Sequence, residues 1–462
     1  MGLSAEQKRI LSLIDTGESM FFTGCAGTGK SYMLNAAIAH LRKKHPSNSV
    51  YVTASTGIAA THIGGITLHS FAGIGLGEGP IDKIIRKVKL NGASLYRWKR
   101  ARVLIIDEIS MISGDLLELI DTVARAVRDE KEKPMGGIQV IATGDFLQLP
   151  PVVKRGDKKK NALFAFQAPC WNDLFTHEEV LHRVYRQENK AFVKLLSEMR
   201  MGRITGDMMC SLDRTKENTF PADGILPTVL YSHRVDVNQR NQCELEKLNT
   251  HPVHTYTSCD TGSKANMASL AKNCIAPQCV KLRVGAQVML IANIRVAAGL
   301  ANGSRGVVTG FARNASSEVA QYGMDVLVKF TNGKTIAISP RSGCWEKREG
   351  DRVRASRHQI PLILAWAITV HKRFASFPHT PSPRPTNRLS QGMTLDRVEM
   401  DLSRVFEYAM AYVAVSRATS MSTMRLTGTF DPTRVKLAHP DAVKYYDQLH
   451  KNGMGTLFSS FH

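Results

Sequence analysis

Long apolar runs are missing from this sequence, which nowhere reaches the roughly 18 apolar residues that a membrane-spanning helix requires. Residues 1–7 lack the apolar core of a signal peptide. Met1-Gly2 is a poor myristoylation match because Glu6 stands where that signal has Ser or Thr. We therefore expect a soluble protein whose organelle address, if it has one, lies outside this chain.

Cysteine is scarce, and its spacing indicates no cross-link or metal site. The eight cysteines form no C-x-x-C pair, the spacing found in many zinc sites. Neither a zinc site nor a disulfide framework is therefore indicated. A reducing compartment is the simple inference.

Acidic residues are few beside basic ones: 40 Asp and Glu against 61 Lys and Arg, a formal net charge of +21. This excess favours a polyanionic partner and argues against an acidic small molecule as the only ligand. The alternative is a basic surface that contacts only solvent. Because 462 residues exceed what one hydrophobic core supports, we expect at least two domains.

Residues 20–31 carry the strongest motif, a short apolar strand, a glycine loop and a helix start that fit G-x-x-x-x-G-K-[ST]. Backbone N–H groups of such a loop point at phosphate oxygens, and the helix N-terminus adds partial positive charge. We expect Lys30 to reach the β- and γ-phosphates of a nucleoside triphosphate and the Ser31 hydroxyl to hold Mg²⁺. The expected nucleotide-binding residues are Gln7, Gly24, Gly27, Thr28, Gly29, Lys30 and Ser31. The alternative is a glycine-rich turn that binds nothing, and for Gln7 an amide that contacts only water.

Polar side chains follow two further apolar strands. Asp107 and Glu108 end the strand that starts at Val103, and Gln148 follows the strand of residues 138–142. Ligands of a parallel α/β sheet collect at this edge. We expect Asp107 to hold Mg²⁺ through water, Glu108 to polarise the attacking water, and Gln148 to sense the γ-phosphate.

A third strand, residues 50–53, leads into small residues that suit a sugar-phosphate backbone, Thr56 and Gly57 among them. Farther on, His69 and Phe71 lie in a glycine-rich segment and could stack on bases. The alternative, that both are core residues at a domain edge, weighs equally on this stretch alone. Residues 76–100 have a basic, helical pattern and predict a small insertion.

Several segments together resemble the petite-integration-frequency (PIF-type) DNA helicases of superfamily 1, subgroup B, which move 5′ to 3′ on single strands. The similar segments are 53–57, 63–75, 106–111, 144–152 and a signature stretch at 124–139. The resemblance spans about residue 3 to residue 447, and a generic P-loop protein would lack the signature stretch.

The second half follows the same pattern. Arg186 lies in the Val184-Tyr185-Arg186-Gln187 segment, and Arg417 lies on a helix that resembles the one bearing the family's second arginine finger. A guanidinium grips phosphate bidentately and keeps its charge, although most arginines form only surface ion pairs. On the resemblance, the DNA-contacting residues extend to Pro150, His371, Lys372, Gln391 and Thr394.

The resemblance implies two RecA-like α/β domains with mostly parallel sheets plus a small inserted β-barrel. We expect the first domain at 1–180, the second at 181–299 and 356–447, and the barrel at 300–355, where short apolar strands alternate with turn residues. ATP would bind between the two domains and draw them together through Lys30, Arg186 and Arg417. Hydrolysis would release this attraction, so that the DNA grips of the two domains alternate.

The chain departs from the family in two places. Ala409-Met410 stands where the family usually has Gly-Gln, and residues 373–389 separate His371-Lys372 from Ser390-Gln391-Gly392. Four prolines, three arginines and no acid make 373–389 an irregular loop. It is a genuine insertion or a translated, unspliced intron; the second reading requires an AGG codon at Arg373 and an AGY codon at Ser390.

These observations predict an ATP- and Mg²⁺-dependent 5′-to-3′ DNA helicase, a monomer acting on single-stranded and forked or structured DNA. The resemblance implies roles in DNA repair, recombination, replication or telomere maintenance, in the nucleus and/or the mitochondrion. One alternative is a DNA-stimulated ATPase that moves along or strips nucleic acid without unwinding. Another is a P-loop nucleotide kinase or metabolic ATPase, which would not explain two arginines or a charge of +21.

Overall fold

The computed structural model describes residues 2–75, 77–151, 163–231, 234–295, 300–313, 323–349, 352–369, 395–402, 408–428 and 438–451. The chain forms two compact units. Unit 1 comprises residues 1–185, 347–354 and 438–462, and unit 2 comprises residues 186–346 and 355–437. No helix in the described ranges is both long and apolar enough to cross a bilayer.

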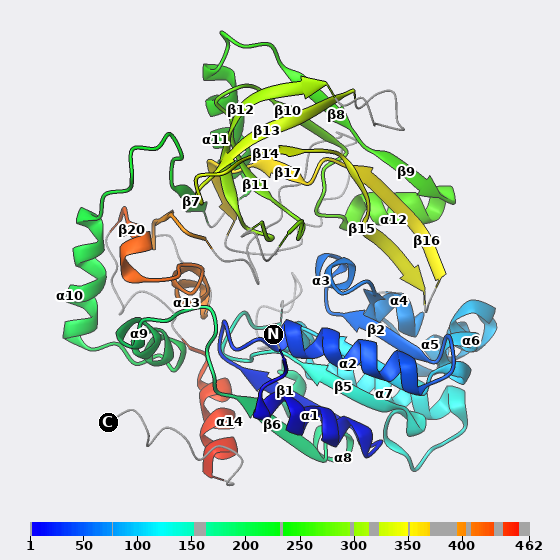
Figure 1. The fold of residues 1–462 in the computed structure, drawn as a ribbon. Helices are drawn as coiled ribbons and strands as arrows, with labels where there is room; N and C mark the ends of the chain where they lie inside the picture. The colour runs from blue at the N-terminus through cyan, green and yellow to red at the C-terminus, as the bar shows by residue number, and fades with distance from the viewer. Residues whose placement is uncertain are drawn as a thin grey trace. The chain divides into compact units, whose positions relative to one another are not determined.

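Unit 1 contains a six-stranded sheet in the order β3-β2-β4-β5-β1-β6, and every neighbouring pair is parallel (Figure 1). Its strands are β1 (Met20–Gly24), β2 (Val50–Ala54), β3 (Ile66–Thr67), β4 (Val103–Asp107), β5 (Gln139–Thr143) and β6 (His177–Leu181). β1, β2 and β5 are buried along their whole length, as expected of parallel strands covered on both faces.

Helices α1 (Ala5–Asp15) and α2 (Lys30–Lys44) pack against one face of this sheet. Their apolar side chains, such as Ile10, Met33 and Leu34, share a core with strands β1, β2 and β4. The other helices of unit 1 are α3 (Gly57–His62), α4 (Leu68–Ala72), α5 (Ile81–Leu90), α6 (Gly92–Arg100), α7 (Gly114–Arg128), α8 (Trp171–Leu174) and α14 (Pro440–Lys451), with short 3₁₀ turns η1 (Ile109–Met111), η2 (Pro134–Gly137) and η3 (Ala165–Gln167). α5 and α6 are the helices that the pattern of residues 76–100 predicted.

Unit 2 contains a smaller parallel sheet in the order β18-β7-β19-β20. Its strands are β7 (Thr228–Tyr231), β18 (Ala367–Thr369), β19 (Val398–Met400) and β20 (Met424–Leu426). The helices of this unit are α9 (Lys190–Arg200), α10 (Gly206–Arg214), α11 (Arg234–Lys247), α12 (Lys264–Asn273) and α13 (Met410–Val415), with 3₁₀ turns η4 (Thr215–Glu217) and η7 (Met421–Thr423).

Antiparallel sheets complete the fold. A five-stranded sheet has the order β14-β13-β12-β11-β17, and smaller sheets pair β15-β16-β9 and β10-β8. Their strands are β8 (His254–Thr257), β9 (Cys259–Gly262), β10 (Cys279–Leu282), β11 (Gln287–Leu290), β12 (Arg305–Arg313), β13 (Met324–Phe330), β14 (Thr335–Ile338), β15 (Arg341–Glu349), β16 (Arg352–Gln359) and β17 (Leu362–Leu364). The predicted fold class, two parallel sheets with an antiparallel part, is confirmed. The first antiparallel strand along the chain is β8, which lies upstream of residue 300, where we expected the inserted β-barrel to begin.

Candidate nucleotide and DNA sites

The strand order of unit 1 gathers the predicted nucleotide residues on three adjacent strands. β4, β5 and β1 are neighbours, and they lead into Asp107-Glu108, Gln148 and the P-loop respectively. The DNA candidates Thr56 and His69 follow β2 and β3, at one end of the same sheet. Because all six strands are parallel, all of these loops lie at the carboxyl edge of the sheet. Thr56 and His69 follow other strands than the nucleotide candidates, whereas the DNA candidate Pro150 follows β5, as Gln148 does.

The P-loop has the geometry of a phosphate cradle. Gly29 caps α2 with φ 84°, a conformation that costs a side-chain-bearing residue strain, and no side chain caps the helix. An N-terminus without a side-chain cap suits a phosphate, because the first N–H groups of a helix have no partner within the helix. The Lys30 ammonium donates to the backbone oxygens of Gly24 (2.6 Å) and Cys25 (3.1 Å), which keeps it over the loop.

Gln7 and Tyr185 lie beside this loop. Gln7 is 3% exposed, and its Oε1 accepts from the Ser4 N–H at 3.1 Å, so its Nε2 is the group that faces Gly29. Tyr185 donates its backbone N–H to the Gly27 oxygen (2.8 Å), while its ring, near Gly29, is 44% exposed. We did not predict Tyr185 from sequence, although an exposed aromatic residue beside Arg186 was a usable signal.

Glu108 has an unusual backbone conformation at the end of β4. Its φ of 55° and ψ of 46° are left-handed, which is uncommon for a residue other than glycine and often marks a functional position. Asp107, at the strand end, accepts the Glu108 N–H at 2.9 Å. Both carboxylates are half-buried, as polarising or metal-binding groups at a sheet edge would be.

Three buried hydroxyls surround this strand end. Ser55, Ser110 and Thr143 have side-chain oxygens without a hydrogen-bond partner among the described residues. Ser55 donates its backbone N–H to the Asp107 oxygen, and Thr143 is the register partner of Asp107 on β5. Buried polar atoms without a protein partner are commonly satisfied by water or an ion. Together with the Asp107 carboxylate, this oxygen-rich set fits hydrated Mg²⁺.

Gln148 belongs to a buried hydrogen-bond network that the sequence did not indicate. Its Nε2 donates to Asp145 Oδ2 at 3.1 Å, and Asp145 also accepts the Tyr446 hydroxyl at 3.2 Å. Tyr446, on α14, lies 2.6 Å from the hydroxyl of Thr23, which directly precedes the P-loop glycine Gly24. A contact between residues 423 positions apart leaves no periodic trace in a single sequence.

Phe71 is a correction to our predictions. It is 0% exposed, and its ring packs against Tyr51 (5.1 Å between centroids) and Trp98 (4.8 Å). Arg97 donates to the backbone oxygens of Ser70 and Phe71, which fastens α6 over α4. The predicted base stacking by Phe71 is wrong because the helical insertion buries the ring.

The other DNA candidates of unit 1 differ in exposure. Thr56 is 4% exposed, and its hydroxyl accepts the Ala59 N–H at 3.3 Å to cap α3. Gly57, which starts α3, is buried, whereas His69 on α4 and Pro150 are half-exposed. DNA contact by these four residues stays a prediction, and at Thr56 the backbone would have to make it.

The two arginines of unit 2 are held by the same short loop. Arg186 donates to the Ser416 oxygen (3.2 Å), and Gln187 Nε2 donates to the oxygens of Ser416 (3.3 Å) and Ala418 (3.0 Å). Arg417 is 1% exposed, with its Nε on the Val413 oxygen (2.8 Å) at the end of α13. This bond uses the Nε donor of Arg417, and Nη2 donates to the Ser416 hydroxyl at 2.8 Å. Gln187 positions the loop and was missed because an isolated glutamine carries no signal.

His371, Lys372, Gln391, Thr394 and the segment 373–389 lie outside the described residues. Leu395 is the first described residue after this segment, and its N–H donates to the Arg417 oxygen at 2.8 Å. The chain next to the DNA candidate Thr394 is therefore hydrogen-bonded to the arginine loop.

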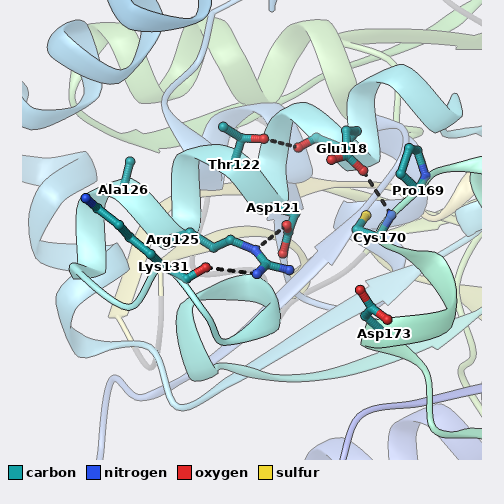
Figure 2. A pocket seen from close by; sticks show the side chains of 9 residues that line it. All are labelled: Glu118, Asp121, Thr122, Arg125, Ala126, Lys131, Pro169, Cys170 and Asp173. Atoms are coloured by element: carbon teal, nitrogen blue, oxygen red, sulfur yellow. Dashed lines mark hydrogen bonds and ion pairs between the residues drawn. The ribbon is translucent and has the colours of Figure 1, made fainter.

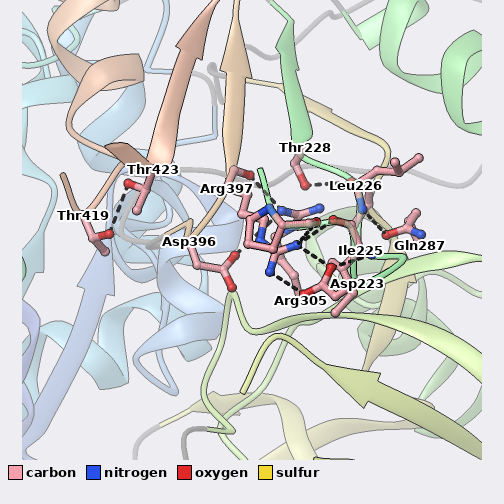
Figure 3. A network of polar contacts seen from close by, with 12 residues as sticks. Asp223, Ile225, Leu226, Thr228, Gln287, Arg305, Asp396, Arg397, Thr419 and Thr423 are labelled. Carbon is pink, nitrogen blue, oxygen red and sulfur yellow. Dashed lines mark hydrogen bonds and ion pairs between the residues drawn. The ribbon is translucent and has the colours of Figure 1, made fainter. Parts of the chain in front are cut away.

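Two residues farther, Arg397 forms a bidentate ion pair with Asp223, at 2.6 and 2.5 Å (Figure 3). The buried Arg305 donates to the Arg397 oxygen at 2.8 Å. The Arg397 guanidinium lowers the pKa of Asp223 to about 2, and burial lowers the pKa of Arg305 to about 10. This network ties β12, the first strand after residue 300, to the chain that enters β19.

The signature stretch begins in the last turn of α7, and its 3₁₀ turn η2 packs against that helix. Arg125, Ala126 and Lys131 of the stretch line part of a pocket of about 390 Å³ (Figure 2). Asp121 accepts the Arg125 Nε and the Met135 N–H, both at 2.6 Å, and Arg125 also donates to the Lys131 oxygen. Glu118 accepts the Cys170 N–H at 3.0 Å. These hydrogen bonds hold residues 131–135 against α7, so the stretch has a structural role here.

Known proteins of one family match this chain. The "PIF1-like helicase" family matches residues 2–208, and "DNA helicase Pif1, 2B domain" matches residues 267–311. The chain is 41% identical over 449 residues to the ATP-dependent DNA helicase PIF1 of Xenopus laevis, covering 97% of this chain and 65% of the relative. The chain thus spans slightly less than two thirds of that relative's length.

Two solved structures are similar over nearly the whole chain. The Pif1 helicase from Candida albicans is 37% identical, with a TM-score of 0.70, and the match covers 97% of this chain and 100% of that one. A Pif1 helicase from Bacteroides in complex with ADP-AlF3 and single-stranded DNA is 28% identical, with a TM-score of 0.59 and 98% of both chains covered. The chain belongs to the PIF1-like helicase family.

Proposed function

We propose that this protein is an ATP-dependent DNA helicase that moves 5′ to 3′ on single-stranded DNA. The observation that carries the proposal is the convergence of the P-loop, Asp107-Glu108 and Gln148 on the adjacent strands β1, β4 and β5. Support also comes from the relatives, since a Bacteroides Pif1 was crystallised with ADP-AlF3 and single-stranded DNA. A nucleotide and a single DNA strand are the two ligands proposed here.

In this proposal, the first-turn N–H groups of α2 and the Lys30 ammonium hold the phosphates. Glu108 polarises the attacking water, and Gln148 contacts the γ-phosphate. Arg186 and Arg417 stabilise the charge that develops there. Ser31 and Asp107 would hold Mg²⁺, which neutralises phosphate charge when bound. Hydrolysis then changes how the two units grip the strand at Thr56, His69 and Pro150 and at the candidates of residues 371–394.

A strand-release assay tests the proposal. The chain should release the labelled strand of a forked duplex with a 5′ tail when ATP is present, and it should leave a 3′-tailed duplex intact. Lys30→Ala serves as the matched inactive variant. ATP hydrolysis on single-stranded DNA without strand release would identify a translocase instead. An ATPase rate that ignores DNA and a DNA affinity that ignores salt would favour a metabolic ATPase.

Residues 373–389 permit a second experiment on the same function. If they are a translated intron, deleting them restores an uninterrupted His-Lys-Ser-Gln-Gly segment, and the shortened chain should unwind faster. Equal rates would mean that the segment is harmless. Codons other than AGG at Arg373 or AGY at Ser390 would rule out this splice.

We also propose the nucleus or the mitochondrion as the compartment, which imaging of a tagged full-length protein would test.

A further inference from the structure

Helix α14 returns to unit 1 from the far end of the chain and places two adjacent tyrosines in its core. Tyr445 and Tyr446 belong to the same helix, but their hydroxyls have different partners. Tyr445 donates to Glu178 on β6 at 2.6 Å, and its ring stacks on Phe166 with 4.3 Å between centroids. Tyr446 points instead at the strand ends that carry the nucleotide residues.

The Tyr446 hydroxyl has three partners, and a phenol has only one proton to donate. It donates that proton to Asp145 Oδ1 at 3.2 Å and accepts the Phe146 N–H at 3.3 Å. The Thr23 hydroxyl, 2.6 Å away, must therefore be the donor in the third contact. Tyr446 is 1% exposed, and Thr23 and Asp145 are 0% and 1% exposed, so water does not compete for these bonds.

The network continues to the γ-phosphate sensor. Asp145 Oδ2 accepts Gln148 Nε2 at 3.1 Å, and Oδ1 accepts the Leu147 N–H at 3.2 Å. One buried carboxylate thus fixes both the loop after β5 and the amide orientation of Gln148. Through Tyr446, this carboxylate is bound to Thr23, next to the first P-loop glycine.

We propose that Tyr446 is a positioning residue for ATP hydrolysis, which sets Gln148 relative to the P-loop through Asp145 and Thr23. Fast ATP turnover then requires that α14 is packed in unit 1. The chain that follows unit 2 thus affects the proposed nucleotide site of unit 1. This inference rests on the proposed ATPase function. It adds a residue that touches neither nucleotide nor DNA.

The test compares Tyr446→Phe with Tyr445→Phe in the full chain. Both variants remove one hydroxyl from neighbouring positions of one helix, the Tyr446 hydroxyl from a buried network and the Tyr445 hydroxyl from a partly buried bond to Glu178. Tyr446→Phe should lower kcat for ATP about tenfold and change KM less than about twofold, because Gln148 is misplaced while the P-loop still binds. Tyr445→Phe should stay within about twofold of the parent. Unchanged kcat in Tyr446→Phe, or equal losses in both variants, would overturn the proposal.

Two further measurements separate positioning from general damage. On a Gln148→Ala background, Tyr446→Phe should change kcat less than about twofold, and multiplicative losses would contradict action through Gln148. Thr23→Val removes the same bond from the other side and should reproduce the kcat loss even if Tyr446→Phe folds poorly.

Hydrogen exchange provides a readout that does not need activity. Amides 145–148 should exchange about tenfold faster in Tyr446→Phe than in Tyr445→Phe, and unchanged exchange would refute the positioning role even in a chain without ATPase activity. A parent protein that shows the expected exchange but hydrolyses no ATP would instead contradict the proposed function.

Discussion

The parallel sheets of the two units have similar strand pairing but different loops. In unit 1, β1 leads into a glycine loop and the uncapped start of α2, which suit phosphate. In unit 2, the sequence between β7 and α11 is Ser232-His233, without a glycine, and the groups proposed for the nucleotide are Arg186, which donates to the Ser416 oxygen, and Arg417, which donates to the Val413 oxygen. The comparison teaches that the parallel sheet is a shared scaffold and that the loops differ. In the proposed function, the loops of unit 1 would bind the nucleotide and the arginines of unit 2 would supply positive charge.

The largest effect on ATP turnover is expected from a change of Lys30 in the proposed nucleotide-binding loop of unit 1. Lys30→Ala should abolish ATP turnover, because the ammonium over Gly24 and Cys25 is the proposed contact to the β- and γ-phosphates. Single-stranded DNA binding, measured by fluorescence anisotropy, should remain within about threefold, since the DNA candidates follow other strands. Joint loss of ATP turnover and DNA binding in a folded variant would contradict this separation.

Removal of either candidate arginine of unit 2 should lower kcat almost as strongly. Arg186→Ala and Arg417→Ala should each lower kcat by about 10³ with little change in nucleotide affinity, as loss of an arginine finger does. Arg240→Ala is the matched control, because Arg240 forms a surface ion pair with Glu244 in the same unit and should have no effect on kcat. Normal hydrolysis by either finger variant would remove that arginine from the site.

A change of Phe71 tests whether this residue stabilises the core of unit 1 or contacts DNA. Because its ring is fully buried against Tyr51 and Trp98, Phe71→Ala should destabilise unit 1 by about 3–5 kcal/mol. Thermal unfolding measures this loss, and Phe71→Leu should recover most of it. A stable Phe71→Ala variant with weakened DNA binding would return Phe71 to the DNA interface.

The success and the failures of the sequence analysis have physical causes. The P-loop, the β4 carboxylates and Gln148 could be predicted because each follows a short apolar strand, and parallel strands bring such ends together. Phe71 could not be assigned, since an aromatic residue in a glycine-rich segment suits both a base and a core. Its burial depends on Arg97 and Trp98 of the helical insertion.

Tyr446 and Gln187 were missed for a different reason. Their roles depend on contacts with Thr23 and Ser416, which are 423 and 229 positions away. No local pattern encodes such pairings.

The smallest effect concerns the ion pair that holds the chain after residue 394. Hydrogen bonds from Arg397 depress the pKa of Asp223 from 3.8 to about 2, so the charged carboxylate stabilises the folded state. A depressed carboxylate pKa gives stability that is fully present above about pH 4 and lost as pH falls towards 2. Since the Asp223 side chain is 30% exposed, we expect Asp223→Asn to cost about 1–2 kcal/mol at pH 7.

Urea unfolding of both proteins between pH 3 and pH 7 measures this contribution. The difference between parent and Asp223→Asn should be constant from about pH 5 upward and should shrink below about pH 4. Asp213→Asn is the control, because Asp213 pairs with Lys216 on an exposed helix end, where removal should cost less than about 0.5 kcal/mol. If the Asp223→Asn difference stayed constant down to pH 3, the charge of Asp223 would not be what stabilises unit 2 through Arg397. The arginine loop would then depend on its bonds to Arg186, Gln187 and Leu395.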